Sequence, residues 1–289
     1  MGTLLIANRN LVKKADPDRY ICTLFADREV QEFLFAIYAL YNELAAIPFR
    51  TQEANLGEIR LQWWRETLLA SKLEINLSND PIMQGIYKLN GQPKFNRELM
   101  LSIIDEREND LSKRQPKTIE ELEKYIKNTS GAITFIALDL MDVTNEHIRQ
   151  ACQDIALAYG LIGVLRSARF LLNYDRILVP KSLLDRYEVS NEIFKNGKQN
   201  QSLRLIGAAI TGIGESLLLK ARKTQQNIER GAMPCLLLSS LTSLYIKQLK
   251  RLNYDVFDLR LSQPTNWRAW VLAFNYCCLL YTSPSPRDQ

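Results

Sequence analysis

The sequence predicts an all-helical, single-domain protein, and three observations support this prediction. Apolar residues recur at helical spacing in most long segments, no series of alternating strands is present, and neither a repeat nor a long linker divides the 289 residues. The composition, 46% hydrophobic and 24% charged, is typical of a globular protein. A chain of this length can bury one large core.

The first predicted helix spans 33–47 and is apolar on nearly every side, with only Asn42 and Glu43 polar. Such a pattern indicates a buried central helix. Pro48 should end or kink it, because proline lacks the backbone N–H that a helix interior needs. An amphipathic helix is expected next, over 58–71.

The remaining helices follow in order along the chain. Residues 96–113 place apolar side chains on one stripe and charges on the other, and Thr118 with Glu121 forms a capping box that starts another helix. The segment 176–180 (RILVP) is the strongest candidate for a short extended segment. Further helices are expected at 150–172, 202–223 and 234–252, and helix connections at 76–80, 91–93 and 196–201.

Charge and composition exclude several function classes. The net charge is +5, yet no basic run is interleaved with aromatic residues, so nucleic-acid binding is not expected. The five cysteines are scattered without metal-ligand spacing, which indicates neither a zinc site nor a disulfide framework. His147, the only histidine, lies in the polar stretch NEHIRQ and predicts a surface helix position rather than a catalytic base.

The two ends of the chain carry different expectations. The N-terminus has too short an apolar run for a signal peptide, and the most apolar stretch, 205–219, is interrupted by glycines and Glu215. These features predict a soluble protein, at most peripheral to a membrane. The tail 278–289 can be back-translated into a transposon-type sequencing adapter read in frame, so we expect the native domain to be 1–277. A natural disordered tail is the alternative, which a genomic reading frame encoding YTSPSPRD would support.

Three segments, taken in order, resemble the squalene/phytoene synthase family. FLFAIYALYNELAAI (33–47) resembles the first signature helix of that family, and GLIGVLRSARFLLNYDRILVP (160–180) resembles the second with the strip that follows it. The central match comprises Asp110, Leu111, Leu122, Tyr125 and Gly131. The resemblance implies an isoprenoid-synthase-type helical bundle around a central cavity.

The same resemblance shows that the paired aspartates of active members are absent from this chain. Active members join prenyl diphosphates using Mg²⁺ held by paired aspartates, and an Asp-x-x-x-Asp spacing puts both carboxylates on one helical face. Here residues 44–52 contain no acid, and Ser167 and Leu171 stand where the second pair would follow Arg166. With Arg169, that face becomes positive and suited to an anion. We therefore expect no catalytic residues and no cofactor. Glu106 and Asp110 fit either a relic metal site or a solvated helix face.

GEIRLQWWRETL (57–68) resembles the branch of the family akin to its complex I assembly factor. Arg60 and Trp64 share a helical face, with Arg65 beside them, and this set fits either a headgroup or acidic peptide, or ordinary packing. The candidate cavity or anion-binding residues are Arg60, Trp64, Arg65, Tyr125, Arg166, Ser167 and Arg169.

Together, these observations favour a non-catalytic factor in respiratory complex I assembly. The resemblance implies a complex I subunit or assembly intermediate as partner and a lipid, prenyl group or partner segment as ligand. It also implies a cytoplasmic location peripheral to the inner membrane, or the mitochondrial matrix in a eukaryote. The rival is an active prenyl-diphosphate transferase of the squalene or phytoene synthase type, which would need Mg²⁺ and unconventional ligands such as Glu43, Glu106 or Asp110.

Overall fold

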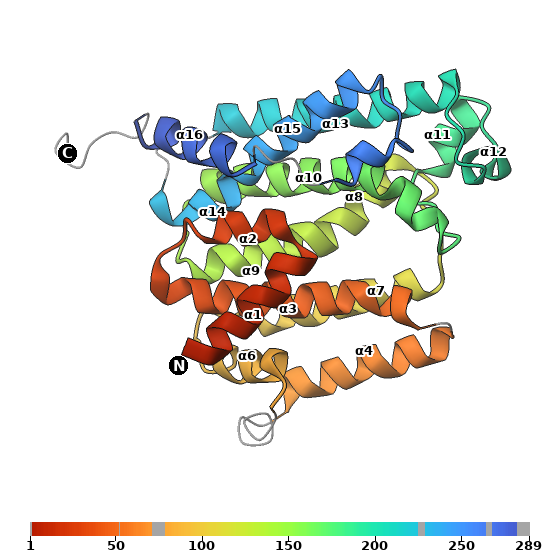
Figure 1. Cartoon of the computed structure of the whole chain (residues 1–289). Coiled ribbons are helices and arrows are strands. Elements are labelled where there is room, and N and C mark those ends of the chain that lie inside the picture. Colours follow the sequence, from red (N-terminus) through yellow and green to blue (C-terminus); the bar gives the residue numbers. More distant parts are fainter. Residues whose placement is uncertain (1, 52, 71–78, 225–228, 264–267, 282–289) are drawn as a thin grey trace. The chain divides into compact units, whose positions relative to one another are not determined.

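The computed structural model describes residues 2–51, 53–70, 79–224, 229–263 and 268–281, with side chains from Ile6 to Tyr276. Helix is the only regular secondary structure in these ranges, which confirms the all-helical prediction (Figure 1). The strip 176–180 forms no strand. Of the predicted adapter tail, 282–289 lies outside the described residues. The chain separates into two compact units, and the single-domain prediction stays a prediction.

Unit 1 comprises Met1–Ser112, Ala132–Arg149 and Glu229–Cys235. Its helices are α1 (Gly2–Ala15), α2 (Pro17–Thr23), α3 (Arg28–Arg50), α4 (Ala54–Leu69), α6 (Pro81–Leu89), α7 (Arg97–Leu111), α9 (Ala132–Leu140), the first turn of α10 (Glu146–Leu172), η2 (Arg230–Ala232) and most of α14 (Met233–Leu236).

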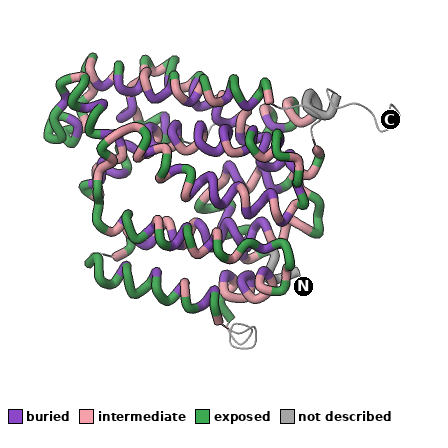
Figure 2. Tube along the Cα trace, turned by 180° about the vertical axis from the view of Figure 1, so that it is seen from behind, coloured by how far each residue is buried: buried purple, intermediate pink, exposed green. Residues whose placement is uncertain are grey.

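Helix α3 is the centre of unit 1. It contacts α1, α2, α4, α6, α7 and α9, and every residue from 34 to 41 is buried. This confirms the predicted central helix, because a segment that is apolar on all sides must be covered on all sides. Helix α4 is instead largely exposed and lies at the lower left of Figure 2. It packs mainly on α7, and a Cβ at Gly57 would come within 2.4 Å of the Leu111 side chain.

Two predicted boundaries in these segments are wrong. Helix α3 does not end at Pro48 but continues to Arg50, because a proline this near the C-terminal end removes only the hydrogen bond to the Leu44 carbonyl. The single helix expected over 234–252 is two helices, separated at Leu237. There the Ser240 N–H donates a hydrogen bond to the Leu237 carbonyl, and the Ser239 hydroxyl donates one to the Leu236 carbonyl. These local bonds interrupt the α-helical pattern.

Unit 2 comprises Lys113–Gly131, Gln150–Ile228 and Leu236–Gln289. Its elements are α8 (Ile119–Ile126), the π-helical η1 (Lys127–Gly131), the remainder of α10, α11 (Lys181–Arg186), α12 (Asn191–Lys195), α13 (Gln201–Thr224), α15 (Leu238–Arg251), η3 (Leu259–Leu261) and α16 (Arg268–Tyr281).

Helix α10 forms the core of unit 2, and two of its neighbours approach it closely through glycine. A Cβ on Gly160 of α10 would overlap Ile126 of α8, and one on Gly214 of α13 would lie 3.3 Å from Ile162 of α10. By length and composition alone, both α10 and α13 are apolar enough to cross a membrane. The apolar window of α10 is 56% buried and that of α13 only 39% buried. Helix α13 therefore leaves more apolar surface uncovered.

Candidate functional site

The carboxylate on the first signature-like helix is held by arginines. Glu43 of α3 accepts a hydrogen bond from Arg50 at 2.5 Å and lies 3.8 Å from the guanidinium of Arg60 on α4. The Glu43 side chain is only 14% exposed, so two cations already surround it in a partly desolvated place. A metal ion at Glu43 would have to displace both arginines.

Glu106 and Asp110 on α7 do not act as a pair. Asp110 is buried and bonds to Arg107 at 3.0 Å, one turn before it, whereas Glu106 is half-buried and accepts a hydrogen bond from Asn109. The Arg107 guanidinium also lies over the Tyr41 ring, 5.0 Å from its centroid. Asp110 therefore belongs to an arginine cluster inside unit 1, which explains how a charged residue is accommodated there.

Buried residues around Arg107 extend this cluster. Arg19 of α2 lies against the same Tyr41 ring, 5.3 Å from its centroid, and forms an ion pair with Asp16 at 2.8 Å. Arg19 also lies over Tyr38, whose own burial raises the pKa of its hydroxyl well above the ordinary value. No sequence motif marks this cluster, because its members come from three separate helices.

The two tryptophans of α4 take opposite positions. Trp64 is buried, with 4% of its surface exposed, whereas Trp63 is 45% exposed, and their rings meet edge-to-face with centroids 4.6 Å apart. Adjacent helical residues point about 100° apart, so burial of one leaves the other outside. Arg65 bonds to Asp105 at 2.6 Å and to Glu108 at 2.7 Å on α7. The Glu108 hydrogen bond, followed by that of Asp105, raises the pKa of Arg65.

In unit 2, the arginines of the second signature-like helix meet backbone carbonyls. Arg166 donates to the Leu261 carbonyl at 3.4 Å, and its guanidinium lies 3.4 Å from the Tyr245 ring centroid. Arg169 donates to the Phe257 carbonyl at 3.1 Å. These contacts join α10 to α15 and to the segment around η3.

The two other candidates on α8 and α10 make local contacts. The Ser167 hydroxyl donates to the Val164 carbonyl on its own helix. Tyr125 is half-buried on α8, where its carbonyl accepts from the Thr129 hydroxyl at the start of η1. The structure thus groups Arg60, Trp64 and Arg65 in unit 1, and Tyr125, Arg166, Ser167 and Arg169 in unit 2.

The side chains present do not fit a magnesium site. Mg²⁺ needs several oxygen ligands in octahedral geometry, with free carboxylates among them. Glu43 and Asp110 are each bonded to arginine, and within the described residues no three His, Cys, Asp or Glu side chains gather where they could hold a metal. His147, near the start of α10, is exposed as predicted.

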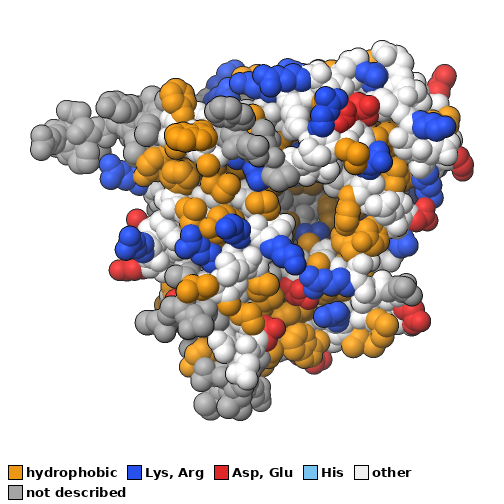
Figure 3. Space-filling view, viewed as in Figure 1, with side chains coloured by type: hydrophobic (Ala, Val, Ile, Leu, Met, Phe, Trp, Pro, Cys, Tyr) orange, Lys and Arg blue, Asp and Glu red, His pale blue; other side chains and the backbone are white. Residues whose placement is uncertain are grey.

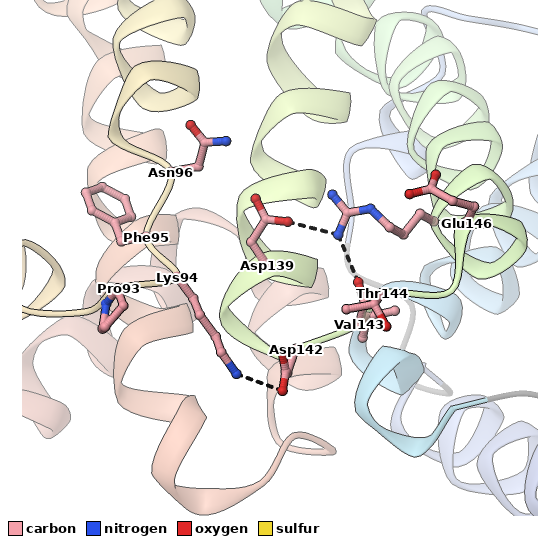
Figure 4. Close-up of a pocket in the computed structure, with 10 residues that line it drawn as sticks. Pro93, Lys94, Phe95, Asn96, Asp139, Asp142, Val143, Thr144 and Glu146 are labelled. Atoms are coloured by element: carbon pink, nitrogen blue, oxygen red, sulfur yellow. Dashed lines mark hydrogen bonds and ion pairs between the residues drawn. The ribbon is translucent and has the colours of Figure 1, made fainter.

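A cavity that the sequence did not indicate lies in unit 1 (Figure 4). It has a volume of about 580 Å³ and is lined by the 93–96 segment and by residues around the start of α10. Lys94 bonds to Asp142 at 2.8 Å across it, and Arg149 bonds to Asp139 at 2.9 Å and to the Val143 carbonyl. No motif marks these residues, because loop and helix ends far apart in the sequence bring them together.

Solved structures define the class of protein. The chain matches a dehydrosqualene synthase with a TM-score of 0.81 at 17% identity, covering 96% of this chain and 97% of that one. It matches a squalene synthase from Alicyclobacillus acidocaldarius with a TM-score of 0.74 at 15% identity, covering 87% and 94%. The protein therefore has the all-helical isoprenoid (terpenoid) synthase fold, as predicted.

The family follows from the sequence match. The squalene/phytoene synthase model matches residues 12–270, and this chain belongs to that family. Its relatives include complex I assembly factor 6 from Mus musculus, 26% identical over 253 residues, or 88% of this chain and 76% of the relative. The Homo sapiens protein is 25% identical with the same coverage, and the Drosophila melanogaster homolog is 22% identical, covering 85% and 75%. Both resemblances inferred from sequence are confirmed.

Proposed function

We propose that this chain is a non-catalytic member of the squalene/phytoene synthase family that takes part in assembling respiratory complex I. One observation carries the proposal: Glu43 and Asp110, which a metal-dependent transferase would need free, are bonded to arginines. Prenyl-diphosphate ionisation requires a metal to take up the leaving charge. The assembly-factor relatives, matched over most of the chain, support the assembly part of the proposal.

The partner contact in this proposal lies on the outward face of α4. Leu56, Ile59 and Trp63 form a stripe at helical spacing, with exposed fractions of 51%, 65% and 45%. A groove of about 400 Å³ lies here, and Glu58 and Glu66 line it together with Ile59 and Trp63. Orange side chains with red ones beside them are visible over the lower part of the molecule in Figure 3.

Charge selects the kind of partner for the α4 face. Arg60 and Arg65, expected from the sequence to attract an anion, are already bonded to carboxylates. The charges left at the groove are Glu58 and Glu66. The proposed occupant is therefore an apolar segment of a complex I subunit or assembly intermediate, flanked by Lys or Arg. This role implies work at the inner membrane, in the mitochondrial matrix of a eukaryote or the cytoplasm of a bacterium.

Deleting the gene and measuring assembled complex I tests the role. We expect reduced complex I, restored by the unaltered gene but not by an Ile59→Ser, Trp63→Ala variant. Leu69→Ser is the matched control, because Leu69 is also exposed on α4 but does not line the groove. Normal complex I in the deletion strain contradicts the role. Equal loss with both variants contradicts the α4 assignment.

The second candidate function is an active prenyl-diphosphate transferase, which the likeness to a dehydrosqualene synthase favours. Incubating purified protein with Mg²⁺ and farnesyl or geranylgeranyl diphosphate distinguishes the two. We expect no diphosphate release, and no shift in melting temperature with Mg²⁺ and a diphosphate analogue. Robust turnover that Glu106→Ala abolishes establishes the transferase instead.

A further inference from the structure

Three packed helices of unit 2 carry an unbalanced positive charge. Helix α13 contributes Lys or Arg at 204, 220, 222 and 223, α15 at 247, 250 and 251, and α16 at 268. The only carboxylate on these helices, Glu215, is bonded to Lys250 at 2.5 Å, and Lys220 is bonded to Asp154 of α10 at 3.1 Å, which leaves the other cations in excess. Helix α15 contacts both α13 and α16, so these charges share one layer. A row of Lys and Arg is visible along the upper edge of Figure 3, where α13 and α15 lie.

A polar pocket of about 360 Å³ opens in this layer. Its polar lining is Arg222, Ser239, Ser240, Ser243, Lys247 and Asn275, and no carboxylate is among the residues that line it. Arg222 donates to the Ser243 hydroxyl at 3.4 Å. Within the described part of the chain, neither Arg222 nor Lys247 forms an ion pair. Guanidinium, ammonium and hydroxyl groups around one small space form the donor set that binds phosphate oxygens.

Two aromatic side chains stand beside the pocket. Trp270 and Phe274 on α16 are 73% and 70% exposed, and they lie one turn apart on the same face. Each directly precedes a residue that lines the pocket, Val271 or Asn275. Large aromatic side chains are rarely left in water, and they are enriched where protein meets the headgroup region of a bilayer.

We propose that the α13–α15–α16 surface binds an anionic phospholipid bilayer, with a lipid phosphate in the pocket between Arg222 and Lys247. Trp270 and Phe274 enter the headgroup region beside it. Neighbouring cations on the same layer add attraction to other anionic lipids. The low burial of the apolar window of α13 is consistent with an outward-facing layer. The binding depends neither on the α4 face nor on the assembly role, so it goes beyond the proposed function.

Vesicle flotation with the full chain tests the proposal. The protein is mixed with phosphatidylcholine vesicles, or with vesicles that also contain phosphatidylglycerol. We expect binding only to the anionic vesicles, weakening as salt is raised. Binding to both kinds alike contradicts the electrostatic part of the proposal, and binding to neither contradicts the membrane assignment. Single-stranded RNA bound more tightly than anionic vesicles also contradicts that assignment.

Matched variants test the pocket. Each cation beside an anionic surface strengthens binding about fivefold, so Arg222→Gln with Lys247→Gln should weaken binding on the order of 25-fold. The control is Lys223→Gln with Arg251→Gln, which removes the same charge from the same two helices outside the pocket lining. A clearly smaller loss in the control supports the pocket, and equal losses overturn it. Unchanged melting temperatures show that both pairs fold.

Two further measurements complete the test. The first distinguishes a lipid phosphate from free phosphate, and the second measures the contribution of the aromatic side chains to binding. Inorganic phosphate should compete only weakly with vesicles, because it lacks the bilayer that the aromatics contact. Phosphate that binds tightly without any vesicle binding overturns the lipid assignment. Trp270→Ser with Phe274→Ser should retain salt-sensitive attraction but lose the binding that persists at high salt. Unchanged high-salt binding in this variant excludes the aromatic contact.

Discussion

In unit 1 the arginines of α4 lie against carboxylates, as Arg65 does against Asp105 and Glu108 and Arg60 does against Glu43. In unit 2 two arginines of α10 donate to backbone carbonyls, Arg166 to that of Leu261 and Arg169 to that of Phe257. A carboxylate cancels the charge of a guanidinium, whereas a carbonyl satisfies its hydrogen bonds and leaves the charge in place. Within the described residues Arg169 forms no ion pair and keeps its charge, whereas the charge of Arg65 is neutralised by its two carboxylates.

The two proposed binding surfaces differ in charge in a similar way. The α4 face of unit 1 has its cations neutralised and presents Glu58 and Glu66. In the α13–α15–α16 layer of unit 2, Lys220 and Lys250 pair with carboxylates, whereas Arg222 and Lys247 form no ion pair among the described residues. A basic apolar segment suits the first surface and an anionic bilayer the second.

The largest expected effect comes from breaking the buried pair in unit 1. Arg107→Met leaves Asp110 buried without its ion-pair partner, and we expect the free energy of unfolding to fall by about 3 kcal/mol. Urea denaturation measures it. Arg169→Met in unit 2 is the comparison, because it loses one bond from an exposed side chain and should cost less than about 1 kcal/mol. Equal losses contradict the contrast between the units.

Arg166 should give the next largest effect. Arg166→Met removes the contact with the Tyr245 ring and the hydrogen bond to Leu261, so we expect the free energy of unfolding to fall by about 1–2 kcal/mol. Arg166→Lys keeps the charge but loses the planar contact, and should restore only part of the stability. If neither variant changes stability while phosphate binding is lost, Arg166 acts as the anion ligand inferred from sequence.

The Arg65 pairs on the surface of unit 1 should contribute less. We expect Arg65→Gln to lower the free energy of unfolding by about 0.5–1 kcal/mol, because these pairs are partly exposed to water. A double-mutant cycle with Glu108→Gln measures the coupling, which should shrink as salt is added. Coupling that is zero at low salt shows that the carboxylates do not hold Arg65.

Asp258 and Arg260 form an ion pair within unit 2, as Arg114 and Glu121 also do. The hydrogen bonds of Arg260 hold the pKa of Asp258 at about 2, below its ordinary 3.8. A lowered folded pKa means that the charged carboxylate stabilises the fold above about pH 4 and that this stability is lost as the pH falls toward 2. Asp258→Asn should remove this pH dependence, about 0.5 kcal/mol, in unfolding curves at about pH 5 and about pH 3. If the pH dependence of stability is the same in the variant, the Asp258 carboxylate does not contribute to it.

The sequence predicts most of the fold because its strongest signals are local. The run of apolar residues at 34–41 identifies α3 as central, and Thr118 marks the start of α8 by accepting the Glu121 N–H. A hydrophobic pattern does not reveal the break at Leu237, because the break involves the Ser239 hydroxyl and the Ser240 N–H, which bond to the carbonyls of Leu236 and Leu237.

The candidate site is less predictable, because its contacts are not local. The sequence identifies Arg65 as a notable cation, yet its partners Asp105 and Glu108 lie 40 and 43 positions further along the chain. Likewise, the acceptors of Arg166 and Arg169 are carbonyls, which every residue carries and no motif marks. Residue types can be read from the chain, whereas their pairing requires the packing of the helices.

Gly57 gives the close packing of α4 against α7 a further consequence. A side chain at this position would overlap the methyl end of Leu111, so either Leu111 or the helix would have to shift to make room. The Arg65 pairs join the same two helices two turns further along α4. Ion-pair strength depends on distance, so any shift of α4 away from α7 caused by a methyl group at 57 would weaken these ion pairs without touching them. Residue 57 can therefore influence the Arg65 ion pairs without contacting them.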